Sequence, residues 1–167
     1  MKKVYKTINS ACISVILSSC FGGTPLFIGL FASCPEKPNC ISTKNSIPSI
    51  PAKPIYFQVT YVNTKQDLLL AIKSFEPAKI KIELDQFIHV EFISKIFRFV
   101  DDIEFYLNEP GVIHFRSASR FGYSDLGVNR RRMERVCLAF NNIKENEISK
   151  TLNTKSKATI AHPKQNH

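Results

Sequence analysis

The stretch SKIFRFVDDIEFYLNEPGVIHFRSASRFGYSDLGVNRRR, residues 94–132, decides the fold of this chain of 167 residues. Apolar Ile, Phe and Leu alternate with polar residues on both sides of the segment NEPG, residues 108–111. Such alternation is typical of a strand with one buried face, and Asn, Pro and Gly favour turns. The stretch therefore predicts two strands, 100–107 and 112–117, paired as an antiparallel hairpin.

The same alternation sorts the polar side chains of this hairpin. If the apolar residues face the core, Asp102 and Glu104 face the opposite side of the sheet. His114 and Arg116 share that side from the second strand, and hairpin register sets these acids and bases side by side. We therefore expect a polar face on the hairpin.

This polar face has three interpretations. In the one that we favour, Arg116 bridges Asp102 or Glu104 in a structural network of ion pairs. Asp125 or Asn129 would then cap the following helix. In the second interpretation, arginines hold an anionic group at the start of that helix; in the third, the face is catalytic. The residues of the polar network or ligand-binding site are Arg98, Asp101, Asp102, Glu104, His114, Arg116, Ser117, Ser119, Arg120, Tyr123, Asp125, Asn129 and Arg130.

The catalytic interpretation would make the protein a hydrolase or a transferase. His114 with Asp102 or Glu104 would form an acid–base pair, and a local serine would act as the nucleophile. The serines in reach are Ser117, Ser119 and Ser124. Neither a G-x-S-x-G elbow nor a phosphate-binding loop is present in the sequence. We therefore favour a non-enzymatic binding or structural module without a cofactor, whose partner would be an anionic small molecule or a protein.

Segments before the hairpin extend the predicted sheet. Apolar and polar residues alternate over residues 55–62, 79–84 and 87–93, which predicts three more strands. Short strands joined by tight turns form an antiparallel meander. We expect an α+β fold with an antiparallel sheet of about five strands.

Two helices are predicted to pack on one face of this sheet. The first begins at Asn63-Thr64, because Asp67 three residues after Thr64 completes a helix start signal. Pro77 ends it. The second begins at the end of the central stretch, where apolar residues recur at helical spacing. These residues are Met133, Val136, Cys137 and Phe140.

The formal net charge of +9 is concentrated toward the two ends of the chain. Residues 1–10 contribute +3 and residues 143–167 another +3, which leaves +3 for all residues between them. This distribution is only a weak indication of nucleic-acid binding, and we expect none. Residues 143–167 show no period and predict a disordered basic tail.

The N-terminus has the composition of an export signal. Basic MKKVYK precedes the apolar run ACISVIL, which ends in Leu-Ser-Ser-Cys, residues 17–20. This ending resembles a bacterial lipobox, so we expect residues 1–19 to be a signal peptide and Cys20 to be lipidated. An uncleaved anchor and ordinary cleaved secretion are the alternatives. The expected location is the cell envelope, anchored to the membrane and facing the exported side.

Residues 20–54 would tether the folded domain, residues 55–142, and they include a proline-pinned cysteine loop. Cys34 and Cys40 lie six positions apart, and the oxidising compartment that export implies favours a disulfide between them. A zinc site is the alternative. It needs about four ligands, which Cys137 or a distant His would have to complete. We predict the disulfide and no metal, with Cys137 a small buried hydrophobic residue.

Three motifs resemble a known family. CPEKPNC, SKIFRFVDDIEF and GVIHFRSASRFGYSDLGVNRRRMERV are similar to the family catalogued as domain of unknown function 1499, and the resemblance spans residues 33–140. The family has no established activity, so the resemblance implies no reaction. Its members occur in bacteria and in plant plastids, often behind a signal or membrane segment, which is consistent with export of this chain.

Overall fold

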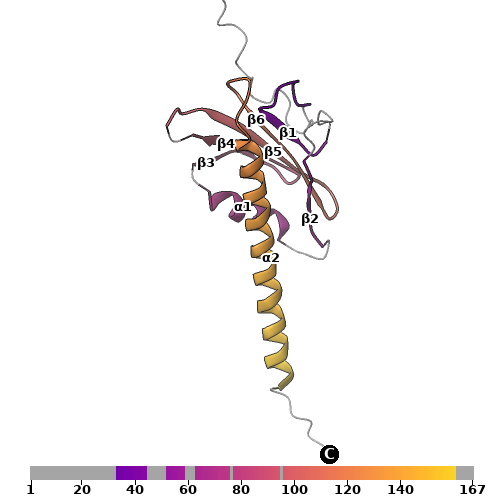
Figure 1. Ribbon diagram of the computed structural model, residues 1–167. Helices are drawn as coiled ribbons and strands as arrows, with labels where there is room; N and C mark the ends of the chain where they lie inside the picture. Colours follow the sequence, from indigo (N-terminus) through magenta and orange to yellow (C-terminus); the bar gives the residue numbers. More distant parts are fainter. Residues whose placement is uncertain (1–32, 45–51, 59–62, 76, 95, 161–167) are drawn as a thin grey trace, which may run out of the picture.

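Four strands that follow one another in the chain form an antiparallel meander (Figure 1). They are β3 (Ala78–Glu83), β4 (Phe87–Ile93), β5 (Val100–Glu109) and β6 (Val112–Ser119). The computed structural model describes residues 33–44, 52–58, 63–75, 77–94 and 96–160. The central hairpin is confirmed: Phe105 of β5 lies opposite Phe115 of β6.

One short strand extends the sheet beyond the predicted five, and a second, at the start of the segment 55–62, is shorter than predicted. Strands β1 (Cys40–Ser42) and β2 (Ile55–Tyr56) both pair antiparallel with β6. The path through the six-stranded sheet is β1-β6-β5-β4-β3, with β2 beside β6. Three residues are too few to display a period of two, so β1 was not predicted. The strand expected over residues 55–62 is only two residues long, and residues 59–62 lie outside the described part.

Strand β3 forms the far edge of the sheet. Its pairing with β4 shifts register between Ile80 and Ile82, which is a β-bulge. Lys79, Lys81 and Glu83 of β3 are exposed, whereas the residues between them are half-buried. The alternation predicted for this segment is therefore present, with one wet face.

Helices α1 (Thr64–Lys73) and α2 (Val128–Ile160) contribute to one core on a single face of the sheet. Helix α1 begins at the predicted residue, but no side chain caps it. Asp67 does not serve the helix start. It is buried and forms an ion pair with the buried Lys144 of α2, so it joins the two helices instead.

Helix α2 corrects the expectation of a disordered tail from residue 143. The chain contains neither Gly nor Pro between Val128 and Ile160, so nothing in the sequence interrupts the helix. Ile143 packs on the core and Lys144 is buried, whereas residues 145–156 are all exposed. In Figure 1 the distal part of α2 extends well beyond the sheet. Residues 161–167 lie outside the described part.

The hydrophobic core lies between the sheet and the two helices. Phe105 of β5 and Phe140 of α2 are its largest fully buried side chains, and Leu68 and Ile72 of α1 complete the contact. Apolar residues of one parity along the strands supply the sheet side, as the alternation predicted. The opposite parity is left for polar side chains.

The predicted signal peptide and Cys20 lie outside the described residues. Within the part that the structure describes, no helix is both long enough and apolar enough to cross a membrane.

Candidate functional site

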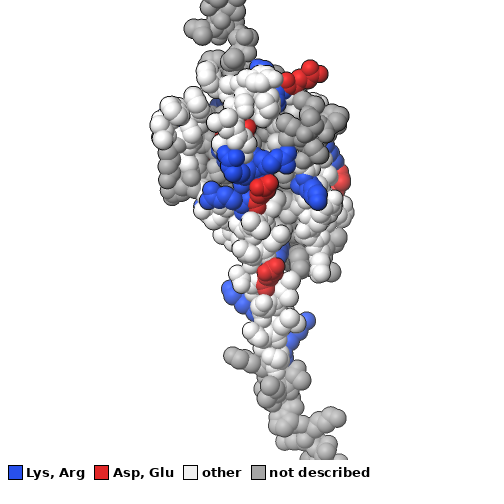
Figure 2. All heavy atoms as spheres, in the orientation of Figure 1, with Lys and Arg blue, Asp and Glu red and all other residues white. Residues whose placement is uncertain are grey.

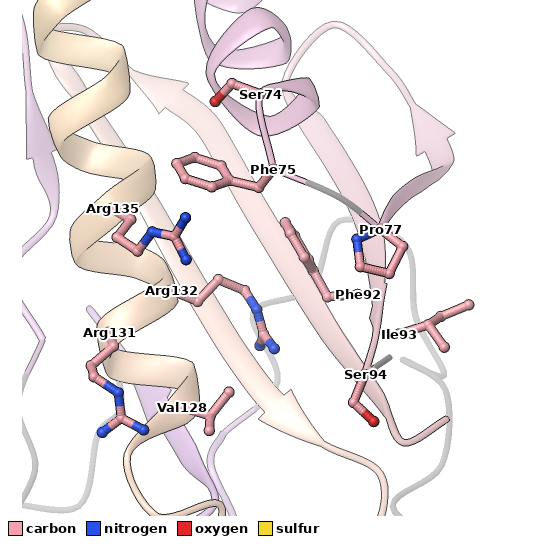
Figure 3. Close-up of a pocket in the computed structure, with 10 residues that line it drawn as sticks. All are labelled: Ser74, Phe75, Pro77, Phe92, Ile93, Ser94, Val128, Arg131, Arg132 and Arg135. Carbon is pink, nitrogen blue, oxygen red and sulfur yellow. The ribbon is translucent and has the colours of Figure 1, made fainter. Parts of the chain in front are cut away.

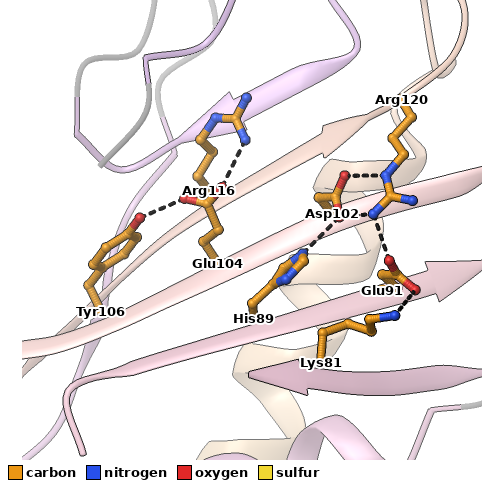
Figure 4. Close-up of polar contacts among 8 residues, drawn as sticks. All are labelled: Lys81, His89, Glu91, Asp102, Glu104, Tyr106, Arg116 and Arg120. Carbon is orange, nitrogen blue, oxygen red and sulfur yellow. Dashed lines mark hydrogen bonds and ion pairs between the residues drawn. The ribbon is translucent and has the colours of Figure 1, made fainter. Parts of the chain in front are cut away.

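The helix-free face of the sheet, the side away from α1 and α2, carries a network of charged side chains (Figure 4). At its centre, Asp102 accepts hydrogen bonds from His89 Nε2 (2.7 Å) and from Nε and Nη2 of Arg120 (both 2.7 Å). Arg120 also donates to Glu91 (2.6 Å), and Glu91 pairs with Lys81 (3.5 Å). Because Glu91 and Asp102 lie opposite each other in β4 and β5, one guanidinium can bridge both carboxylates.

The contacts of this network stabilise its charged forms. Burial raises the pKa of Asp102, but hydrogen bonds from His89 and Arg120 outweigh it and hold that pKa below its usual range. The pKa of Glu91 is lowered in the same way, since hydrogen bonds from Arg120 and Lys81 outweigh its burial. Hydrogen bonds to Asp102 and Glu91 in turn raise the pKa of Arg120. Each charge of this cluster therefore has an opposite partner.

A second group surrounds Glu104, which is fully buried on the same face. It accepts hydrogen bonds from the hydroxyl of Tyr106 (2.6 Å) and from Nη1 of Arg116 (3.2 Å). Burial and the neighbouring carboxylate of Glu104 raise the pKa of Tyr106, which keeps the phenol protonated as a donor. Nε of Arg116 is buried without a hydrogen-bond partner among the described residues. The ion pair expected between Arg116 and one of two acids is thus formed with Glu104.

His114 has different partners from those of the acid–base pair considered above. Its Nδ1 lies 3.0 Å from Thr43 Oγ1 and its Nε2 lies 3.1 Å from Glu109 Oε2. In the hairpin register His114 is opposite Tyr106. Asp102 is four residues farther along β5, which corresponds to roughly 13 Å at about 3.3 Å per residue. A direct hydrogen bond between His114 and Asp102 is therefore out of reach.

The candidate serine nucleophiles do not share the face of His114. Ser117 donates a hydrogen bond to Asn129 Oδ1, and Ser119 accepts one from Asn129 Nδ2 (3.0 Å), so both point toward α2. Ser124 lies in an exposed loop and accepts from the backbone of Leu126. The sheet separates the histidine from Ser117 and Ser119, because successive side chains of a strand point to opposite faces.

Asn129, at the start of α2, is the centre of the polar contacts on the helix side. It is fully buried, and its Nδ2 also donates to the carbonyl of Asn39 (3.1 Å). Its backbone N–H donates to Asp125 Oδ2 (2.7 Å), so Asp125 caps the helix. Arg132 donates to Asn129 Oδ1 (2.9 Å) and to Asp101 (2.7 Å). This set of bonds fastens α2 to β5, β6 and the cysteine loop.

A pocket of about 340 Å³ lies beside these contacts, between α2, the end of α1 and β4 (Figure 3). Arg135 is directed toward Phe75 and Arg132 toward Phe92, with guanidinium-to-ring distances of 4.7 and 4.8 Å. Arg131 also lines the pocket, and its Nη1 donates to the carbonyl of Leu126 (2.9 Å). Figure 2 shows Lys and Arg side chains gathered over the start of α2. We call this cavity the arginine pocket.

The remaining predicted residues are dispersed. Arg98 and Tyr123 are exposed in loops. Arg130 lines a different pocket of about 650 Å³, next to Cys137. Cys137 is half-buried rather than buried, and it packs against the core. Burial raises the pKa of its thiol to about 11.

The cysteine loop contains the predicted disulfide. Cys34 and Cys40 are bonded, with Cα atoms 5.6 Å apart. Among the described residues, no group of three or more His, Cys, Asp or Glu side chains could hold a metal ion.

A family model described as "Protein of unknown function (DUF1499)" matches residues 31–140, well over half of the chain. The chain belongs to the DUF1499 family. The DUF1499 match begins just before the disulfide and ends at Phe140, so it includes the polar network, the contacts of Asn129 and the arginine pocket. The exposed distal part of α2 lies beyond it. No match to this chain was found among the curated proteins or the solved structures.

Two sets of residues at the polar face and the arginine pocket of this DUF1499 chain were not predicted from the sequence. His89 and Glu91 alternate with the apolar residues of β4, so parity alone could have placed them on the polar face. Arg131 and Arg135 are four residues apart, which puts both on one side of a helix. Nothing in the sequence shows that the end of α1 lies across from them.

Proposed function

We propose that this DUF1499 protein is a non-enzymatic binding module of the cell envelope, whose arginine pocket holds an anionic group of a ligand. The observation that carries the proposal is the charge balance of the pocket. Arg132 is neutralised by Asp101 at 2.7 Å. Arg131 and Arg135 form no ion pair with an acidic residue of the described chain.

The pocket has groups suited to a phosphate or a carboxylate. Guanidinium forks bind both groups in a bidentate manner, and Ser74 and Ser94 add two polar residues to the pocket lining. The rings of Phe75 and Phe92 hold Arg135 and Arg132 from one side, which reduces the side-chain freedom lost on binding. Such a site recognises the charged end of a ligand.

The polar network on the helix-free face is not part of this proposal. Its carboxylates already pair with Arg120, Arg116, His89 and Lys81, through the hydrogen bonds and ion pairs drawn in Figure 4. A ligand anion would have to displace a carboxylate from its arginine. We therefore assign the network to fold stability, and the separation of His114 from Asp102 and the serines disfavours a hydrolase.

Binding is tested with inorganic phosphate and pyrophosphate as probes. A ligand that binds only the folded state raises the melting temperature with its concentration. We expect this rise for the wild type and its loss in the double variant Arg131→Gln, Arg135→Gln. The double variant Lys150→Gln, Lys155→Gln is the matched control, because it removes two positive charges from the exposed distal part of α2. If the double variant responds as the wild type does, the pocket is not the binding site.

We further propose that a lipid on Cys20 anchors the module to the membrane, with the folded domain on the exported side. The support is the basic and apolar N-terminus ending in Leu-Ser-Ser-Cys. Cells grown with a radioactive fatty acid should label the wild type, and Cys20→Ser should remove the label. An unlabelled wild-type protein would contradict the lipid anchor.

A further inference from the structure

One end of the sheet presents large apolar side chains to solvent. It is formed where β4 ends, β5 begins, β6 ends and α2 begins, so two loops meet there. We call this surface the aromatic end. Its residues are Ile96, Phe97, Phe99, Phe121, Tyr123 and Leu126, each between 44% and 83% exposed. At about 200 Å² per aromatic side chain, the four aromatic residues alone expose roughly 460 Å², an area at which an apolar surface patch is often functional.

Three rings of the aromatic end stack on one another. Phe99 stacks on Phe97 and on Phe121, with ring centroids 5.5 and 5.4 Å apart. The first loop is closed by hydrogen bonds from Ser94 N to the carbonyl of Phe99 (2.8 Å) and from Phe99 N to Ser94 Oγ (2.9 Å). These bonds hold the rings outward in a fixed arrangement.

Backbone strain is concentrated in the same two loops. Arg98 (φ 57°) and Leu126 (φ 54°) have positive φ, and in the described chain no other residue except glycine does. This conformation is unfavourable for residues with a Cβ atom. Leu126 is nevertheless 83% exposed, so core packing does not explain why an apolar residue occupies the position.

The charge of this end is positive. Arg98 is exposed between Phe97 and Phe99, and the arginines at the start of α2 follow the second loop. Of the acidic residues nearby, Asp125 caps α2 and Asp101 and Asp102 pair with arginines, whereas Glu36 of the cysteine loop is exposed. An apolar surface with exposed arginines fits a layer that is apolar inside and anionic at its surface.

The chain reaches the folded domain at this same end. Asn39, next to the disulfide, donates a hydrogen bond to the carbonyl of Gly122 (2.6 Å), beside Phe121. Thirteen residues separate Cys20 from Cys34, a span of at most about 45 Å. Figure 1 places the first described residues beside the loop between β6 and α2, with the end of α2 on the opposite side.

We propose that the aromatic end rests on the surface of an anionic phospholipid bilayer, so that α2 points away from the membrane. The position of the tether supports this inference only with the proposed lipid at Cys20. The exposed rings and arginines support it independently of that lipid. The aromatic side chains insert at the headgroup level and Arg98 contacts lipid phosphates. The domain thus has one orientation on the membrane.

The absence of Trp from the chain makes a direct test available. Phe97→Trp places a fluorophore in the aromatic end, and Leu152→Trp places the matched control on the distal part of α2, where Leu152 is exposed. Each full-length protein is reconstituted into vesicles of phosphatidylglycerol and phosphatidylethanolamine with brominated acyl chains. We expect bromine to quench the Phe97→Trp reporter at least about threefold more than the control. Equal quenching would overturn the proposal.

Two further arms separate this inference from the lipid anchor and from other occupants. Quenching of the Phe97→Trp reporter should persist with Cys20→Ser, since the surface itself binds lipid; its loss would leave the anchor alone responsible. Arg98→Glu, or omission of phosphatidylglycerol, should weaken the quenching. If a second copy or another protein covered the aromatic end, bromine would not quench the Phe97→Trp reporter, and the inference would fail while fatty-acid labelling of Cys20 remained.

Discussion

At the scale of single residues, the polar network depends on Asp102. It accepts three hydrogen bonds, one from His89 and two from Arg120, while being almost fully buried. Because Arg120 also serves Glu91, removal of the charge at Asp102 affects three strands and the loop after β6. The network therefore stabilises the sheet on the side where no helix covers it.

We predict that Asp102→Asn lowers the free energy of unfolding at pH 7 by about 2–4 kcal/mol, because it leaves Arg120 partly unpaired. The folded-state pKa of Asp102 is depressed, so its contribution is present above the unfolded pKa of about 4 and is lost as pH falls through the lower folded value. Urea unfolding of wild type and variant from pH 7 to pH 2.5 should show the difference shrinking below about pH 4. A constant difference would contradict this role.

Residue patterns predicted the composition of the polar face better than its pairings. Alternation placed Asp102, Glu104, His114 and Arg116 together, because a strand with one buried face has no other arrangement. The partner of each acid depends on cross-strand register and on the loop that returns Arg120 over the sheet. These are three-dimensional relations that one sequence does not display, so the contact of His114 with Glu109 was not predicted.

At the scale of elements, α1 and α2 are joined by the buried ion pair between Asp67 and Lys144. Removing one partner of a buried ion pair lowers the free energy of unfolding strongly, because the other charge is left buried and unpaired. Replacing both partners by apolar residues costs much less. The pair accordingly specifies which turn of α2 lies against α1 more than it adds stability.

We predict that Asp67→Leu and Lys144→Met each destabilise the protein by about 3–5 kcal/mol, whereas the double variant Asp67→Leu, Lys144→Met loses less than either. Thermal and urea unfolding of the four proteins form a double-mutant cycle. Additive losses in the double variant would show that the two side chains act independently.

The distal part of α2 should be dispensable for the fold. Truncation after Ile148 removes only residues that are exposed where the structure describes their side chains, so we predict a change in unfolding free energy within about 0.5 kcal/mol. Far-UV ellipticity should fall with the lost helical residues. Truncation after Asn142, which removes Ile143 and Lys144 from packed positions, is the destabilising control. A large loss in the longer protein would reveal contacts of the distal segment.

The full length of α2 was not predicted from the sequence. Apolar spacing identified α2 up to Phe140, and its packed face ends at Lys144. Beyond that point the helix carries polar residues on every side, and its persistence depends on continuity with packed turns rather than on a period. The arginine pocket was not predicted for a related reason: it requires the end of α1 and the start of α2 to meet across more than fifty residues.

At the scale of the whole molecule, the disulfide holds the N-terminal segment against the sheet. The bonded loop leads directly into β1, which pairs with β6. In the chain-entropy estimate, a loop of this size stabilises the folded state by about 2 kcal/mol. The disulfide also determines where any tether leaves the domain.

We predict that Cys34→Ser with Cys40→Ser lowers the free energy of unfolding by about 2 kcal/mol and leaves the sheet folded. Chemical unfolding of wild type and variant measures the loss, and intact mass after thiol blocking, with and without reductant, counts the bridge. Cys137→Ser serves as the control, because its free thiol closes no loop. Free Cys34 and Cys40 in protein taken from the envelope would contradict a structural disulfide.

The edge strand β3 limits how copies of this protein can associate. Its bulge between Ile80 and Ile82, and the charges of Lys79, Lys81 and Glu83, oppose strand-to-strand addition of a neighbouring copy. Copies of a protein that is confined to a surface are present at high local concentration. An edge strand without such features would then promote polymerisation of the copies. If the proposed anchor concentrates the protein on a membrane, the bulge and charges of β3 would oppose strand-to-strand association of neighbouring copies at this edge.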